Sequence, residues 1–117
     1  MNRHSRKLLW DVRLAIERIA AFTAGRERDD YSRDLMLRSA VERQLEIVGE
    51  APSPLRKADP DTAARIPDLP KVVGLRTILI HAYADVDDDM VWAAVRKNLP
   101  ALRDQLDALA GNPRHAP

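Results

Sequence analysis

Arg76, His81 and Tyr83 are the residues of this 117-residue chain whose types and spacing suit chemistry best. They place a permanent cation, a group that titrates near neutral pH and a phenol close together. A guanidinium holds a phosphate through two parallel hydrogen bonds and stays charged at any cellular pH. An imidazole accepts and donates a proton near pH 7. We therefore take Arg76 and His81 as candidate catalytic residues for phosphodiester cleavage, with no metal and no other cofactor.

The spacing of these three residues predicts that they do not converge on one helix. In a regular helix, Arg76 and Tyr83 would lie about 20° apart, while His81 would lie about 140° from Arg76. They meet only if the helix ends near His81 and the chain turns, or if a second copy of the chain supplies the missing partner. A two-fold axis brings the same patch of each subunit face to face. The spacing therefore favours a site shared by a homodimer.

A purely structural interpretation of the same residues stays open. Arg76 would then pair with Asp85 or Asp87, His81 would end its helix as a C-terminal cation, and Tyr83 would pack on the core. This interpretation predicts no chemistry at the motif.

Other polar groups in the sequence lack the partners that a metal site needs. Asp85, Asp87 and Asp89 imitate the first half of a calcium loop, but Met90 stands where the turn needs glycine and Arg96 where a bidentate glutamate is required. We expect no metal site.

Glu46 and Glu50 are one helical turn apart and form a candidate acid pair, although two carboxylates on a helix more often face solvent. Glu50 stays a candidate supporting residue.

Composition limits the class of protein. The chain has the length of one domain, contains no cysteine, and carries 19 basic and 18 acidic residues for a net charge of +1. No global field therefore draws in nucleic acid, and any RNA contact must be local. The early apolar stretch is interrupted by charges, and no segment reaches the ~20 uncharged residues of a membrane span. We expect a cytoplasmic protein without membrane contact.

Hydrophobic periodicity predicts helices throughout, with no strand-period run. Apolar residues three and four apart indicate helices over 7–23 and 32–50, the second with an inner face of Leu37, Val41, Leu45 and Val48. Residues 26–30 are expected to connect them, after Gly25 ends the first helix. Five prolines predict a loop over 51–70 with short helical turns near 55–58 and 62–66.

The second half of the chain predicts three further helices. The first covers 69–81 with Asp68 as its cap, and the next covers 88–98, with Asp88 and Asp89 facing the positive end of its dipole. Pro100 should kink this helix or begin another over 101–110, which Gly111 ends. We expect one helical domain over 1–111 and a disordered tail over 112–117.

The motif region resembles a known family. Gly74-Leu-Arg76-Thr-Ile-Leu-Ile-His81-Ala-Tyr83-Ala-Asp-Val-Asp87, with Leu45-Glu-Ile-Val-Gly-Glu-Ala51 before it and Val91-Trp92 and Asn98-Leu-Pro100 after it, resembles the HepT-like toxins of the HEPN superfamily. The R-x4-H-x-Y element is the diagnostic part, and the likeness covers nearly the whole chain in order.

This resemblance implies a fold, an activity and partners. The implied fold is all-α, an antiparallel up-and-down bundle of four to five helices, in a homodimer whose cleft carries both motifs. The implied activity is a metal-independent endoribonuclease with Arg76 and His81 as catalytic residues. The implied partner besides RNA is a minimal nucleotidyltransferase of the MNT type, an antitoxin that adenylylates Tyr83 and could form a higher oligomer with the toxin. Thr77 departs from the polar Asn or Asp that many members carry after the arginine, and its hydroxyl is a candidate replacement.

Two other classes of function are consistent with the sequence. A helical dimer could bind nucleotide or the nucleotidyltransferase without performing a reaction, which the near-neutral charge fits equally well. A plain helical dimerisation unit is the third reading, and it predicts that changes at the motif alter only stability.

Overall fold

The computed structural model of the 117-residue chain describes residues 1–72 and 88–110, and every regular element in these residues is helical. The all-α prediction is confirmed there. The elements are α1 (Arg3–Thr23), α2 (Arg28–Arg33), α3 (Leu35–Glu50), α4 (Pro52–Ala58), α5 (Pro60–Ala64), α7 (Asp88–Ala93), the π-helical η1 (Ala94–Asn98) and α8 (Leu99–Ala110). Residues 69–72 are also helical, in agreement with the helix predicted from residue 69.

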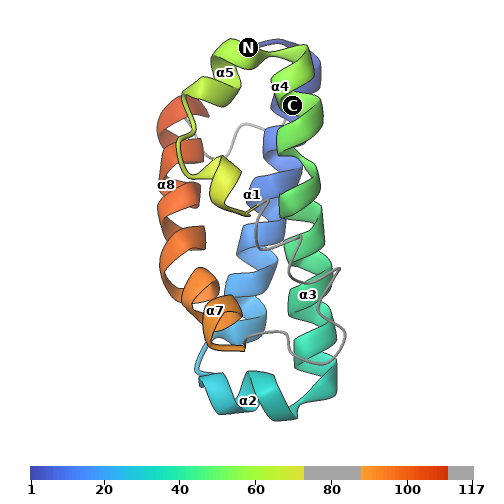
Figure 1. The fold of residues 1–117 in the computed structure, drawn as a ribbon, viewed down its shortest axis with the longest axis vertical. Coiled ribbons are helices and arrows are strands. Elements are labelled where there is room, and N and C mark those ends of the chain that lie inside the picture. The colour runs from blue at the N-terminus through green and yellow to red at the C-terminus, as the bar shows by residue number, and fades with distance from the viewer. Residues whose placement is uncertain (73–87, 111–117) are drawn as a thin grey trace.

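The three long helices lie side by side (Figure 1). The chain runs down α1, turns through α2 and returns along α3, so that α1 and α3 are antiparallel neighbours. α8 packs on α1 and runs in the direction of α3, while α4 and α5 cross the end at which α1 begins. None of the described helices is both long and apolar enough to cross a membrane.

One contiguous apolar core holds the described helices together. The predicted inner face of α3 is confirmed, because Leu37, Val41, Leu45 and Val48 are all buried. Each fully buried aliphatic side chain contributes about 1.5–3 kcal/mol relative to an exposed one. The remaining members come from every other described helix except α5, and from the stretch before residue 73: Leu9, Val12, Ala15, Ile16, Ile19, Tyr31, Ala51, Leu55, Ile66, Leu69, Val72, Val91, Ala94, Val95, Leu99, Leu102 and Leu106.

The first helix begins earlier than its apolar stripe predicts. The side chain of Asn2 accepts a hydrogen bond from the backbone N–H of Ser5 at 2.8 Å, and this cap starts α1 at Arg3 rather than at residue 7. Its end agrees with the prediction, because Gly25 follows the C-cap with φ of +71°, a conformation that glycine adopts without strain.

The connection predicted over 26–30 is wrong, because most of it is the short helix α2. The side chains of Glu27 and Asp30 cap each other's backbone groups in a capping box, which stabilises six helical residues. Asp34 then ends α2 and caps α3 by accepting from the N–H of Leu37, so α3 begins at Leu35 rather than at residue 32. These two caps form a helical corner where the sequence suggested a simple link.

The proline-rich segment is more helical than predicted. Pro52 and Pro60 each occupy the first position of a helix, where the missing N–H costs nothing, and α4 and α5 follow from them. The side chain of Asp59 caps α5 through the N–H of Thr62. With α2, α4 and α5, the described residues contain more helical segments than the four to five predicted, because short helices form where loops were expected.

A new helical element begins close to Pro100, as one of the two predicted alternatives: α8 starts at Leu99 rather than at residue 101, and a π-helical turn precedes it. The chain continues from α7 through η1 into α8, and the N–H of Leu99 donates to the carbonyl of Ala94, five residues back. Proline has no N–H, and its ring clashes with the carbonyl four residues before it in a regular helix. The wider π turn directly before Pro100 accommodates this residue without ending the helical path.

Candidate functional site

The catalytic candidates from the sequence lie outside the described residues. Arg76, Thr77, His81 and Tyr83 all belong to 73–87, which separates Val72 from Asp88. Glu50 is described, and it is the exposed last residue of α3. The part of the site that the structure defines therefore consists of the residues that hold the two ends of this motif-bearing segment.

The amino-terminal end of the segment is anchored in the core. Ile66, Leu69 and Val72 are almost fully buried, with exposed fractions of 0, 2 and 3%. The backbone N–H of Asp68 donates to the side-chain oxygen of Gln105 on α8 at 3.2 Å. The Lys71 ammonium lies 2.9 Å from the Asp68 carboxylate and lowers the pKa of that carboxyl. The chain thus enters the motif-bearing segment from a fixed position beside α8.

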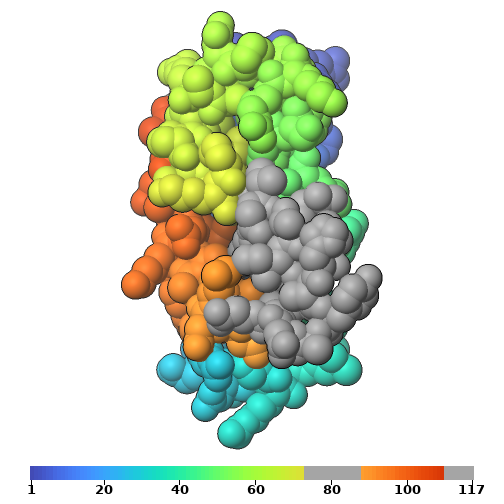
Figure 2. All heavy atoms as spheres, in the orientation of Figure 1, coloured from blue at the N-terminus to red at the C-terminus, as the bar shows by residue number. Residues whose placement is uncertain are grey.

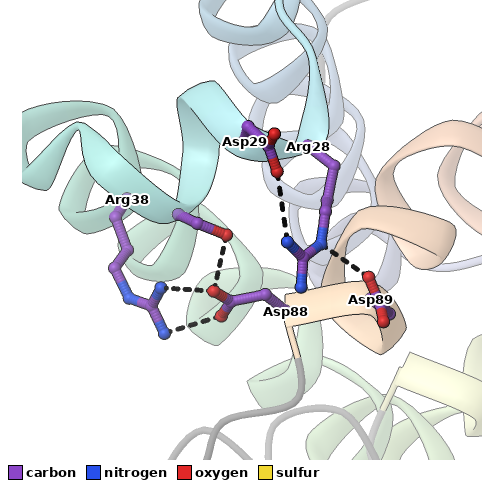
Figure 3. A network of polar contacts seen from close by, with 6 residues as sticks. Arg28, Asp29, Arg38, Asp88 and Asp89 are labelled. Atoms are coloured by element: carbon purple, nitrogen blue, oxygen red, sulfur yellow. Dashed lines mark hydrogen bonds and ion pairs between the residues drawn. The ribbon is translucent and has the colours of Figure 1, made fainter.

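The carboxyl-terminal end is held by an ion pair between α3 and α7 (Figure 3). Nη2 of Arg38 lies 2.8 Å from Oδ1 of Asp88, and Nη1 donates to Oδ2 at 3.0 Å. The hydroxyl of Ser32 on α2 also donates to Oδ2, at 2.7 Å. We call Ser32, Arg38 and Asp88 the Asp88 clamp. It joins three helices at the residue that directly follows the motif-bearing segment.

The arginine of the clamp is fully occupied. Its Nε lies 3.2 Å from Oε1 of Glu42, and its guanidinium carbon lies 5.1 Å from the centre of the Tyr31 ring. Only 24% of the Arg38 side chain and 16% of the Asp88 side chain are exposed. Because the guanidinium is partly buried and its nitrogens and one face already have partners, Arg38 has a structural role rather than a substrate-binding one.

Two aromatic side chains, Tyr31 and Trp92, pack next to the clamp. Tyr31 is fully buried, its hydroxyl donates to Oε1 of Glu42 at 3.3 Å, and its ring centre lies 5.9 Å from that of Trp92. Burial, followed by the charge of Glu42, raises the pKa of the Tyr31 phenol well above its usual range. Tyr31 therefore stays neutral at physiological pH and serves as a packing and hydrogen-bonding residue.

The electrostatics of the clamp favour its ionised form. The hydrogen bond from Arg38 lowers the pKa of the Asp88 carboxyl, and it does so despite the opposing effect of burial; Ser32 lowers it further. The same interaction raises the pKa of Arg38. A second pair lies outside the clamp, where Nε of Arg28 is 2.6 Å from Oδ1 of Asp89 and Nη1 is 3.2 Å from Asp29. These side chains are largely exposed, so solvent screens their attraction.

Sequence reasoning missed the clamp almost entirely. It gave Asp88 only the role of complementing a helix dipole and gave Ser32 and Arg38 no role. Arg38 and Asp88 are 50 residues apart, and no periodicity connects them. The local signal that existed was a charged residue, Arg38, directly after the buried Leu37 in a helix with an apolar inner face.

Other predicted polar groups have ordinary partners. Glu46 pairs with Arg43 at 3.3 Å on an outer face of α3, as expected of a solvated helix. Arg96, which stands at the calcium-loop position of a glutamate, donates to the carbonyls of Arg26 and Thr23 and lies over the Trp92 ring. Within residues 1–72 and 88–110, no three His, Cys, Asp or Glu side chains gather as a metal site.

The comparisons with known proteins agree on a family and a fold. The family model described as HepT-like, "Ribonuclease HepT-like", matches residues 12–109. A Thermococcus cleftensis protein named "Probable ribonuclease HepT" is 35% identical over 112 residues, which cover 93% of this chain and 98% of that protein. A solved structure of the tri-AMPylated Shewanella oneidensis HEPN toxin in complex with MNT antitoxin superposes with a TM-score of 0.68 at 21% identity, over 96% of this chain and 100% of that one. At that identity the last comparison shows a shared fold.

Proposed function

The chain belongs to the HepT-like family, and from that premise we propose that it is the toxin of a toxin–antitoxin pair, a metal-independent endoribonuclease. The observation that carries the proposal is the R-x4-H-x-Y spacing of Arg76, His81 and Tyr83 within a chain that matches this family over residues 12–109. The name of the Thermococcus relative, which refers to ribonuclease activity, supports the same reaction class.

The proposed reaction is an internal transfer at the RNA backbone. The 2′-hydroxyl attacks the adjacent 3′-phosphodiester, the bond to the 5′-oxygen of the next nucleotide breaks, and the products are a 2′,3′-cyclic phosphate and a 5′-hydroxyl. His81 of one subunit removes the 2′-hydroxyl proton, and His81 of the other protonates the leaving oxygen. Arg76 stabilises the charge that develops on the non-bridging oxygens. Acid–base assistance of this kind accelerates a reaction typically ~10²–10⁴-fold.

The reaction requires a homodimer in this proposal. In one regular helix His81 would lie about 140° from Arg76, so a second copy of the motif across a two-fold axis completes the set. Thr77, directly after the arginine, and Glu50, at the exposed end of α3, are proposed as supporting polar groups. The shared cleft would then carry two guanidinium and two imidazole groups.

The proposed regulation is covalent. A partner nucleotidyltransferase of the MNT type would transfer adenylate from ATP to the Tyr83 hydroxyl and release pyrophosphate. The added phosphate and nucleoside, two residues from His81, would block RNA and repel its backbone. The Shewanella neighbour is AMPylated and bound to an MNT antitoxin, which motivates the assignment of this partner class.

The ribonuclease proposal is tested with purified protein and bulk cellular RNA in EDTA. We expect wild type to cleave, and His81→Ala and Arg76→Ala to lose most of the activity while keeping the helical circular dichroism of wild type. Equal cleavage by His81→Ala would remove His81 from the chemistry. No cleavage by wild type would favour a non-catalytic role.

The competing class is a helical subunit that binds nucleotide or the nucleotidyltransferase and catalyses nothing. The net charge of +1 is compatible with this reading. Expression of the chain alone separates the two classes, because a ribonuclease toxin arrests growth and Arg76→Ala relieves the arrest. A binding subunit would leave growth unchanged in both cases.

A further inference from the structure

Asp88 limits where the catalytic candidates can lie, because the backbone connects them closely. It follows Tyr83 by five residues and His81 by seven. Five residues of extended chain span at most about 18 Å, and a folded stretch spans less. Because so few residues connect them, we expect a displacement of Asp88 to change the position of the motif residues as well.

The clamp fixes Asp88 in direction as well as in position. Nη1 of Arg38 donates a hydrogen bond to Oδ2 at 3.0 Å, and Nη2 lies 2.8 Å from Oδ1 as an ion pair without hydrogen-bond geometry, so each carboxylate oxygen has a contact with the guanidinium. Ser32 adds a third contact from a different helix at 2.7 Å. Three contacts to one small carboxylate leave it little freedom to rotate or shift.

Arg38 is not available to bind a phosphate itself. Its two terminal nitrogens contact Asp88, its Nε lies beside Glu42, and one face lies over Tyr31. To bind RNA it would have to abandon a carboxylate that is 16% exposed, which leaves a partly buried charge without compensation. A substrate-binding role for Arg38 is therefore disfavoured.

We propose that Arg38 is a positioning residue for the ribonuclease site: by holding Asp88, it sets the placement of the segment that carries Arg76, His81 and Tyr83. This inference rests on the proposed function for its effect on catalysis. Its effect on the segment itself does not depend on that function.

The chain provides a matched control in Arg13 on α1. Arg13 has an i,i+4 ion pair with Glu17 at 2.9 Å and a long-range ion pair with Asp107 of α8 at 2.6 Å. Its side chain is 19% exposed, against 24% for Arg38. Arg13 thus has the same two kinds of carboxylate partner as Arg38, at a place remote in sequence from the motif-bearing segment, which makes Arg13→Gln the control for Arg38→Gln.

The experiment has two readouts on the full-length chain. The first is steady-state cleavage of a labelled RNA oligonucleotide in EDTA, for wild type, Arg38→Gln and Arg13→Gln. We expect kcat to fall about 10–100-fold in Arg38→Gln with KM nearly unchanged, because small misplacements of catalytic groups cost factors of this size. Arg13→Gln should stay within about twofold of wild type, since its partners Glu17 and Asp107 are remote in sequence from both ends of residues 73–87.

The second readout is hydrogen–deuterium exchange of peptides that cover residues 73–87, followed by mass spectrometry. Exchange in these peptides should be faster in Arg38→Gln than in wild type and unchanged in Arg13→Gln. Arg38→Lys keeps the charge but loses the two-nitrogen contact, so it should give intermediate values in both readouts. Asp88→Asn keeps the shape of the side chain and is the second test if Arg38→Gln unfolds.

The outcomes separate the two proposals. If wild type cleaves RNA and Arg38→Gln and Arg13→Gln have equal kcat and equal exchange over 73–87, the positioning role is wrong while the ribonuclease stands. If wild type does not cleave RNA, the proposed function fails, and the exchange comparison alone decides whether Arg38 holds the segment. Recovery of kcat by Arg38→Lys beyond Arg38→Gln, with slower exchange, supports the role.

Discussion

Arg13 and Arg38 have the same kinds of ion-pair partner, but they connect helices of very different length. Each pairs with a glutamate one turn further along its own helix and with a distant aspartate. Arg13 joins the 21-residue α1 to the 12-residue α8, whose inner faces share one apolar core. Arg38 joins α3 to the first residue of α7, a six-residue helix in which Val91 is the buried residue.

We infer from this difference that similar ion pairs contribute differently to fixing helix positions, depending on the packing around them. Along α1 and α8, packing of Val12, Leu102 and other core residues sets the helix positions before any charge is considered, so the Arg13 pair adds little that is new. At the start of the six-residue α7, Asp88 is held by polar contacts with Arg38 and Ser32, so we expect these contacts to contribute to the orientation of the chain there. We therefore expect the Arg38 pair to affect its surroundings more than the Arg13 pair does.

The largest expected effect concerns the packing between α1 and α8. Leu102 is fully buried, and Leu102→Ala should lower the free energy of unfolding by about 2–5 kcal/mol, the usual cost of a core leucine. Urea unfolding followed by circular dichroism measures it, with the partly buried Leu109→Ala as the milder control. A cost equal to that of Leu109→Ala would mean that core packing does not hold these helices.

The next effect separates the two ion pairs in stability. Arg38→Gln should lower the free energy of unfolding by about 1–3 kcal/mol, the range for lost hydrogen bonds to a charged group. Arg13→Gln should cost less, because Asp107 is 29% exposed and Asp88 only 16%, so water compensates the former better. Urea titrations of both variants test the order, and a larger loss in Arg13→Gln would contradict it.

The contribution of Asp88 should depend on pH with a defined sign. Its pKa is lowered in the folded state, mainly by Arg38, so its stabilisation is complete above the unfolded pKa of about 3.9 and is lost as pH falls through the lower folded value. The difference in unfolding free energy between wild type and Asp88→Asn should be constant from pH 7 to about pH 5 and should shrink below about pH 4. A difference that grows on acidification would contradict the assignment.

The smallest effect is expected at the outer pair of the same corner. Arg28 contacts Asp89 at 2.6 Å, but the two side chains are 44 and 77% exposed. Exposed pairs contribute little, so Arg28→Gln should leave the urea midpoint and RNA cleavage unchanged. A loss as large as that of Arg38→Gln would show that both pairs act as one cooperative network.

The long helices could be predicted because apolar residues spaced three and four apart mark the buried face of a helix. The positions Leu37, Val41, Leu45 and Val48 follow this rule, and all are buried. The helix boundaries were less predictable, because single side chains set them. Asn2 moves the start of α1, and Glu27 with Asp30 converts an expected link into α2. Such caps compete with ordinary turns in a sequence and are decided by the packing around them.

The candidate site was predictable only as a motif. The spacing of Arg76, His81 and Tyr83 indicates a reaction class, and the family match agrees with it, but the roles of these residues stay a prediction because they lie outside the described residues. The Asp88 clamp was not predictable, because its members come from three helices and are brought together only by the tertiary fold. Contacts between distant residues of opposite charge leave no periodic signal in a single sequence.

The most direct test of the central claim is the chemistry of the RNA ends produced in EDTA. Mass spectrometry of the products should find 2′,3′-cyclic phosphates and 5′-hydroxyls with wild type, and neither with His81→Ala. Products with 5′-phosphates and 3′-hydroxyls, or the same cyclic phosphates from His81→Ala, would contradict metal-independent cleavage by the R-x4-H-x-Y motif.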